Sequence, residues 1–305
     1  SLETCGAFAG DWCPYGYSGE MPLDQRLDDG SALNFDSAPL EAPIDLLGAP
    51  VLEAQVTVDQ EVAFIAVWLS DISPDGAATR LTYGLLNLNH LDGHASPRNV
   101  SPGETLAIRV QLNDLGQSIP AGHRIRLSMA TSYWPLIWPS PERVTLTLFT
   151  GNSRLHLPIR NNQSSDHQLN LFSEPECARP LDHTTHTPYA RSRSVEREYA
   201  SGITRVRAVK DRGRIYLHEA DLTYSGKGEE THQITEGDPL SHQIEMTYTI
   251  TLERDNPKWR IRTVTHTLVT ATKSDFLVTA TLDAYEDDVR MFNKSWDTKI
   301  ARDFN

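Results

Sequence analysis

Short runs of alternating apolar and polar residues, separated by tight turns, are the feature that most constrains the fold of this chain. TLAIRVQLNDL (105–115) and VTLTLFT (144–150) alternate, and EVAFIAVWLSDI (61–72) is a β-branched and aromatic run before the turn PDG (74–76). Residues of these types at a period of two form strands. Because no helical periodicity lies between the runs, the pattern predicts an antiparallel all-β sandwich or jelly roll.

The strand pattern divides the chain into three parts. We expect a β-sandwich over residues 1–160 and a linker or crossing segment over 161–194, where the sequence turns polar and contains prolines. Alternation resumes over 195–305 and predicts an antiparallel meander with one buried and one wet face. This last part forms either a second β domain or a continuation of the first sheets, and the sequence leaves both open.

Composition excludes several classes of function. The 305 residues carry a formal net charge of −13, with a pI near 5.3, whereas a nucleic-acid binder usually presents a basic face. No run of about 18 apolar residues is present, so we expect no membrane span. Three cysteines are too few and too sparse for a disulfide framework, which favours reduced thiols over a Cys5–Cys13 pair and a cytoplasmic location over a secreted one.

Motifs for the common catalytic chemistries are absent from the sequence. GYSGE (16–20) is the nearest approach to the G-x-S-x-G turn of a serine hydrolase, but Glu20 replaces its last glycine. His183 and His186 share a proline-flanked loop without further metal-ligand spacing, so we interpret them as solvated. The sequence therefore predicts no catalytic residue, no metal site and no cofactor. Since the first methionine is Met21, we expect the chain to begin within a longer protein.

Three segments together resemble a known family. They are PLDQRLDDGSALNFDSAPLEAPIDLLGAPVLEAQV (22–56), VWLSDISPDGAATRLTYGLLN (67–87) and VSPGETLAIRVQLNDLGQSIPAGHRIRLSMATSYWPLIWPSPE (100–142). In this order they resemble the C-terminal domain of the X-Pro dipeptidyl-peptidase and cocaine esterase (CocE/NonD) family of serine hydrolases. The resemblance covers roughly residues 5 to 160, and the last third looks like a β extension of some larger members.

The resemblance implies a fold, a partner and a role. The family's C-terminal domain is a galactose-binding-like jelly roll that packs against an N-terminal α/β-hydrolase domain. That partner domain carries the Ser, Asp and His of the triad and acts on small esters or peptides, so no residue of this chain inherits a catalytic role. By this resemblance, the chain shapes the substrate pocket and stabilises the hydrolase domain.

Four aromatic residues are the first candidates for a site. In the family, the segment before the DQR motif lies close to the catalytic domain, and here it corresponds to residues 5–23. Phe8, Trp12, Tyr15 and Tyr17 are its matching apolar positions. The resemblance implies that they wall the substrate pocket, or that they fill the interface between the domains.

Four charged residues follow this aromatic segment in the sequence. Asp24, Arg26, Asp28 and Asp29 place one guanidinium among three carboxylates, which indicates a fixed network of ion pairs and hydrogen bonds. We interpret this network as structural. The alternative is that one aspartate binds a substrate amine, which requires a free carboxylate facing the pocket.

The segment at 122–142 ends in two Trp-Pro pairs and suggests a second aromatic site. Tyr133, Trp134 and Trp138 could form a platform for a sugar, since aromatic faces bind sugar rings and jelly rolls often carry such sites. The prolines instead favour a rigid connection that packs at a domain surface. A carbohydrate-binding module and an assembly module, which would form homo-oligomers, therefore stand as alternative functions.

Overall fold

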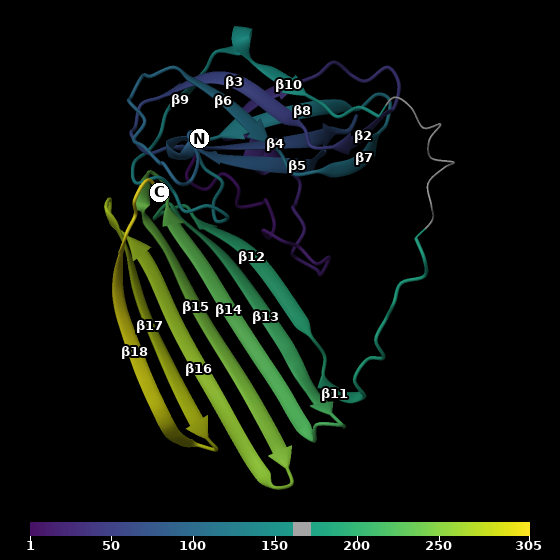
Figure 1. Ribbon diagram of the computed structural model, residues 1–305, viewed down its shortest axis with the longest axis vertical. Coiled ribbons are helices and arrows are strands. Elements are labelled where there is room, and N and C mark those ends of the chain that lie inside the picture. The colour runs from purple at the N-terminus through teal and green to yellow at the C-terminus, as the bar shows by residue number, and fades with distance from the viewer. Residues whose placement is uncertain (161–171) are drawn as a thin grey trace.

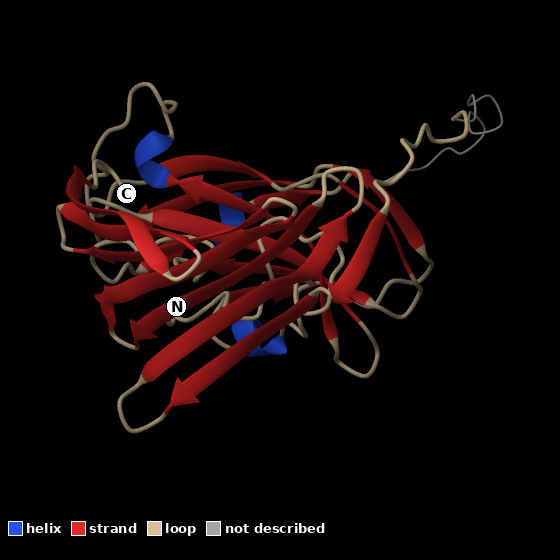
Figure 2. Ribbon diagram, turned by 90° about the horizontal axis from the view of Figure 1, so that it is seen from below, coloured by secondary structure: helices blue, strands red, loops and turns tan. Residues whose placement is uncertain are grey.

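The computed structural model describes residues 1–160 and 172–305, and regular structure in this part of the chain is almost entirely β-strand (Figure 1). All pairings between its named strands are antiparallel. The predicted all-β class is confirmed. Among the described residues, helical structure is limited to the short segments drawn blue in Figure 2, namely α1 (Arg26–Asp29), η1 (Leu88–His90) and η2 (Thr150–Asn152).

The first half of the chain forms a sandwich. One of its sheets has the order β1-β8-β4-β5, with the bounds β1 (Leu33–Asp36), β8 (Arg124–Ala130), β4 (Phe64–Ile72) and β5 (Ala78–Asn87). The facing sheet has the order β10-β3-β6, with β9 also on β3, and its members are β10 (Arg154–His156), β3 (Val51–Val58), β6 (Leu106–Gln111) and β9 (Leu146–Leu148). A two-stranded ladder joins β2 (Ile44–Gly48) to β7 (Leu115–Ile119).

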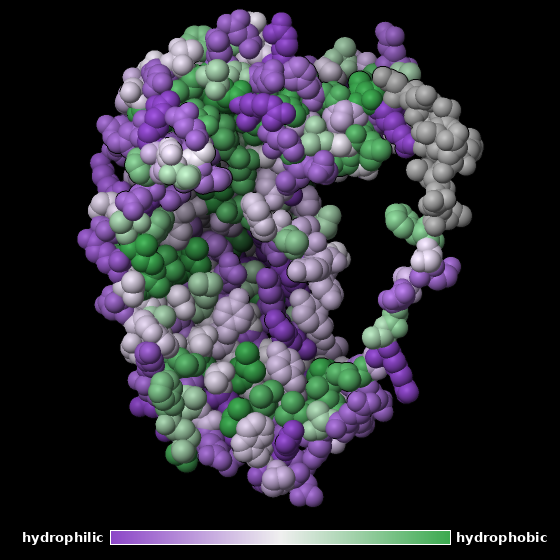
Figure 3. Space-filling view, viewed as in Figure 1, coloured by the Kyte–Doolittle hydropathy of each residue, from purple (hydrophilic) through white to green (hydrophobic). Residues whose placement is uncertain are grey.

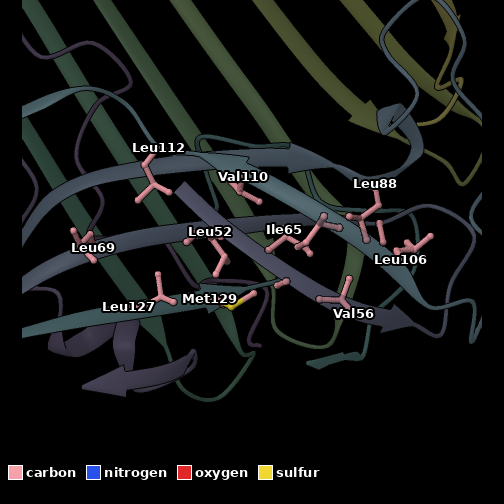
Figure 4. Packing of buried hydrophobic residues seen from close by; sticks show 14 of the residues in the cluster. Leu52, Val56, Ile65, Leu69, Leu88, Leu106, Val110, Leu112, Leu127 and Met129 are labelled. Atoms are coloured by element: carbon pink, nitrogen blue, oxygen red, sulfur yellow. The ribbon is translucent and has the colours of Figure 1, made fainter. Parts of the chain in front are cut away.

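Side chains that point inward from both sheets form the core of the sandwich (Figure 4). β6 alternates strictly between buried and exposed positions, with Leu106, Ile108 and Val110 inside. Full burial of one such side chain contributes about 1.5–3 kcal/mol. The period of two in this part of the sequence therefore reports directly which face of the strand meets the core.

Strand β4 is buried on both faces, which explains why its sequence is apolar without alternation. Ile65 and Leu69 enter the core between the sheets. Trp68 points to the opposite face, where it packs with Cys5 and Ala9 of the N-terminal segment. The N-terminal segment is therefore a second cover on the sandwich, and the position of the residues that follow it depends on this contact.

The second half forms one long sheet, which we call the second sheet. Its order is β11-β13-β14-β15-β16-β17-β18, with β12 also paired to β13. From β13 onward each strand pairs with the next, so the predicted meander is confirmed. The strands are β11 (His183–Thr187), β12 (Ala190–Glu198), β13 (Ile203–Leu217), β14 (Leu222–Thr235), β15 (Asp238–Asp255), β16 (Lys258–Ala271), β17 (Asp275–Glu286) and β18 (Val289–Ala301).

Strand structure in the second half begins earlier than the sequence predicts. Residues 183–187 and 190–198 are strands of the second sheet, although the expected linker extended to 194. Both strands pair with β13. Because their sequence is polar and contains prolines, it predicts a linker there. Residues 172–182 have no regular structure, and the rest of the expected linker, 161–171, lies outside the described residues.

One end of the second sheet, its near end, packs against the sandwich. The ring of Trp138 lies 4.1 Å from that of His242 and 5.2 Å from that of Phe276, centroid to centroid. Trp134 meets His242 edge-on at 6.0 Å. The sheet then extends away from the sandwich, and its far end contains the turns between β13 and β14, β15 and β16, and β17 and β18 (Figure 1).

Strand β18 is the last strand of the second sheet. Within the described residues it pairs with β17 alone, and all of its 13 residues are exposed. Its sequence still mixes apolar and charged side chains, among them Phe292, Lys294 and Trp296.

Candidate functional site: an aromatic loop beside an apolar cleft

Residues 12–19, WCPYGYSG, form an exposed loop between the two β units, which we call the aromatic loop. Trp12 is 63% exposed, Tyr15 82% and Tyr17 53%. A group of exposed aromatic side chains usually marks a binding surface, because covering each ring removes a large apolar area from water. Phe8, the fourth predicted aromatic, turns inward instead and packs against the cluster around Trp134.

Glu20 fixes the conformation of the aromatic loop from its base. One carboxylate oxygen accepts hydrogen bonds from the backbone N–H groups of Tyr15, at 2.6 Å, and Tyr17, at 3.2 Å. The backbone N–H of Asp11 donates to the carbonyl of Glu20 at 2.8 Å and closes the loop. Burial raises the pKa of Glu20, but these N–H groups and the Arg191 guanidinium together lower it by more, so its pKa lies below the ordinary value.

The base of the loop is tied to β12 by a cluster of four charges. Glu20 and Asp11 both pair with Arg191, and Asp11 also pairs with Arg193 at 2.8 Å. Both guanidinium groups are buried. Removing one member of a buried ion pair leaves its partner uncompensated, which is costly. The exposed loop therefore rests on a rigid ionic base.

An apolar cleft of about 440 Å³ lies beside the aromatic loop. Trp12 lines it from the loop, Leu136, Ile137 and Trp138 from the segment after β8, and Phe276 from the second sheet. A cleft of this size and lining accepts a small apolar group or a side chain of a partner protein. The fold thus brings together two predicted tryptophans, Trp12 and Trp138, that the sequence placed in different candidate sites.

The other two members of the predicted platform lie in the interior. Tyr133 and Trp134 are each 0% exposed. Tyr133 packs beside Trp68, with ring centroids 5.4 Å apart, and its hydroxyl accepts a hydrogen bond from Arg80 at 2.7 Å. Rings covered in this way offer no face to a sugar.

The four charged residues around the DQR motif separate into two groups. Asp24 and Arg26 form an exposed pair, which lowers the pKa of Asp24 to about 2 through hydrogen bonds from the Arg26 side chain and backbone. Asp28 and Asp29 are buried on α1. All four carboxylate and guanidinium groups have protein partners, so none presents a free charge to a ligand.

Asp28 and Asp29 organise the N-terminal segment and the sandwich. Asp28 accepts the N–H groups of Gly6, at 2.9 Å, and Phe8, at 3.1 Å. Asp29 accepts the indole N–H of Trp68 at 3.0 Å and pairs with Arg126 at 2.9 Å. Burial raises the pKa of Asp28 to about 6, although the two N–H groups oppose that shift.

Several residues of the site were not recognised in the sequence. Arg191 and Arg193 lie in ARSRSVE, where arginine alternates with serine and valine as on the faces of a strand. That alternation is typical of a strand, but the polar, proline-containing sequence around it predicts a linker. Phe276 gave no signal, because its place beside Trp138 depends on how the two β units pack.

Neither a metal cluster nor a membrane helix is evident in the described residues. Within residues 1–160 and 172–305, no three His, Cys, Asp or Glu side chains lie together as a metal-binding group. None of the described helices is both long and apolar enough to cross a membrane. Cys5, Cys13 and Cys177 are free thiols.

Comparison with known proteins places most of this chain in one family. The family model described as the X-Pro dipeptidyl-peptidase C-terminal non-catalytic domain matches residues 5–196. A Mycobacterium bovis protein named "Putative serine esterase" is 27% identical over 124 residues, which is 35% of this chain and 20% of that protein. The chain thus matches about a fifth of that relative's length.

Solved structures of hydrolases align with part of this chain. An α-amino acid ester hydrolase aligns with a TM-score of 0.44 and 21% identity, over 45% of this chain and 27% of its own. A CocE/NonD family hydrolase from Staphylococcus aureus aligns with a TM-score of 0.38 and 13% identity, over 44% of this chain and 31% of its own.

Proposed function

Because the chain belongs to the family of X-Pro dipeptidyl-peptidase C-terminal non-catalytic domains, we propose that it serves a CocE/NonD-type serine hydrolase by shaping its substrate pocket and stabilising its α/β-hydrolase domain. A domain that is non-catalytic acts through what it contacts, so its function lies in its exposed, rigid surfaces. In this chain those surfaces are the aromatic loop and the apolar cleft.

The aromatic loop and its base differ in exposure, and this contrast supports the proposal. Trp12, Tyr15 and Tyr17 are exposed, whereas the paired Glu20 and Arg191 side chains at the base of the loop are buried. A loop with a rigid base presents its rings in fixed positions, as a binding surface requires. The rings and the cleft would supply an apolar wall for the acyl or amino-terminal side of an ester or peptide substrate.

The role of the loop can be tested by measuring KM and kcat of the full-length protein that contains this chain. We expect Trp12→Ala and Tyr15→Ala to raise KM for a p-nitrophenyl ester with an apolar acyl group by about 5- to 50-fold, the effect of losing one apolar contact. The value of kcat should stay within about twofold, since no reacting group is touched.

Tyr199 provides a matched control. It is exposed at the turn between β12 and β13 and belongs neither to the loop nor to the cleft. Tyr199→Ala should leave both kinetic constants unchanged. Equal losses in all three variants, or none in Trp12→Ala and Tyr15→Ala, would remove the loop from the substrate pocket.

The 305-residue chain by itself should be inert toward p-nitrophenyl esters. Turnover by the purified chain that a serine-directed phosphonate abolishes would contradict the assignment of a non-catalytic role.

A further inference from the structure

The two faces of the second sheet differ in chemistry. On β15, Ile244, Met246, Tyr248, Ile250 and Leu252 share one face, because successive residues of a strand point to opposite sides. Pairing places apolar neighbours beside them on that same face, including Tyr224, Ile261, Val269, Val278, Leu282, Phe292 and Trp296. We call this set the apolar face.

The opposite face is polar and internally neutralised. Its strands carry ion pairs that run across the ladders, among them Arg207–Glu229 at 2.6 Å and Arg214–Glu253 at 2.6 Å. His266 adds a contact to Glu245 at 2.8 Å. An antiparallel sheet with one polar and one apolar face normally has the apolar face covered.

Only the near end of the apolar face is covered within the described residues. There Val206 and Ile234 are buried with Trp134. Farther along, Tyr248 is 41% exposed, Ile250 43%, Phe292 50% and Trp296 40%. Figure 3 shows hydrophobic side chains gathered toward the far end of the second sheet.

The apolar face is continuous with the cleft. Phe276 lies on the face, opposite Ile300 in the register of β17 and β18, and it also lines the cleft beside Trp138. The aromatic loop, the cleft and the apolar face therefore form one connected surface. The family match ends at residue 196, within β12, so nearly all of the apolar face lies beyond it.

We propose that the apolar face is a second docking surface for the same catalytic domain that the cleft and the aromatic loop contact. This inference rests on the proposed function. A partner seated over the cleft meets Phe276, from which the face runs along β17 through Val278 and Leu282. It then crosses the threonines of β16 to reach Tyr248 and Ile250 on β15. The aromatic residues of the face also fit, since interface cores are enriched in aromatic side chains.

Hydroxyl-radical footprinting compares the 305-residue chain with the full-length protein that contains it. In the full-length protein we expect the oxidation rates of Tyr248 and Trp296 to fall by about fivefold or more, because rings covered by a partner are no longer reached by radicals in solvent. Tyr285 is the matched control, because it pairs with Arg262 on the polar face. Its rate should be the same in both proteins.

The outcomes separate this inference from the proposed function. Protection of Trp12 and Tyr15 without protection of Tyr248 and Trp296 would overturn the second docking surface and leave the proposed function standing. Absence of protection at all four positions would overturn both.

A second copy of the chain is the competing occupant. If Tyr248 and Trp296 in the 305-residue chain become protected as its concentration rises, with a matching dimer mass in light scattering, the face binds another copy. That result would also overturn the inference.

Discussion

The buried carboxyl of Asp28, which binds the N-terminal segment, makes the stability of the fold depend on pH. Its pKa is raised from 3.8 to about 6, chiefly by burial. A carboxyl with a raised folded pKa destabilises the fold when it is ionised: the cost is absent below about pH 4, grows through about pH 6 and is complete above it. The shift corresponds to roughly 2–3 kcal/mol.

We therefore expect Asp28→Asn to change the pH dependence of unfolding. Urea titrations at pH 4 and pH 7 should show that the free energy of unfolding of the wild type falls by roughly 2–3 kcal/mol more than that of the variant over this range. Asp24→Asn is the control, because the pKa of Asp24 is held near 2 and its carboxyl is ionised in the folded state at both pH 4 and pH 7. Parallel curves for wild type and Asp28→Asn would contradict the prediction.

His242 has the opposite dependence on pH. Burial lowers its pKa to about 3, with smaller contributions from His232 and Arg302. A histidine with a depressed folded pKa contributes stability that is complete above its unfolded value near 6.5 and is lost as pH falls below it. Acid should therefore weaken the contact with Trp134 and Trp138.

Replacing the imidazole with a neutral ring tests this expectation. His242→Phe should reduce the loss of unfolding free energy between pH 7 and pH 5 by about 2 kcal/mol, since no proton is then taken up. His218→Phe, on the exposed turn after β13, provides the comparison and should leave that loss unchanged. Equal acid sensitivity in wild type and His242→Phe would show that another group is responsible.

At the scale of elements, the aromatic loop depends on a strand far away in the sequence. Glu20→Gln removes the charge that pairs with Arg191 and weakens the acceptor for the N–H groups of Tyr15 and Tyr17. Chymotrypsin should then cut the loop about tenfold faster, because cleavage follows local opening. Glu198→Gln, at the exposed end of β12, should leave the rate unchanged, and an unaltered rate in Glu20→Gln would show that the ionic base does not hold the loop.

The strands of the sandwich and the meander could be predicted from the sequence, because their alternation is local. β6 and β15 show this clearly. Strand β11 could not be predicted in this way, and β12 shows only the alternation of arginine with serine and valine, because both strands are polar and depend on pairing with β13. Likewise, the exposure of the aromatic loop and its pairing with Arg191 depend on contacts across more than a hundred residues, which local periodicity does not encode.

At the scale of the whole molecule, Trp138 joins the sandwich to the second sheet. It contacts His242 and Phe276, so Trp138→Ala removes a large ring at the junction. We expect the free energy of unfolding to fall by roughly 3 kcal/mol, within the range for such truncations. Calorimetry should show one transition in the wild type and two in the variant, as the β units unfold separately. A single transition at unchanged temperature would show that the junction does not couple them.

Strand β18 sets the conditions under which this protein stays dispersed. Its outer backbone groups form a template on which a strand of another molecule can grow, and Lys294 and Lys299 place charge along that edge. Such protection is electrostatic, and the screening length shrinks from about 30 Å at 0.01 M salt to about 8 Å at 0.15 M. Higher ionic strength should therefore favour pairing between β18 edges of different molecules, because salt screens the repulsion between their lysines.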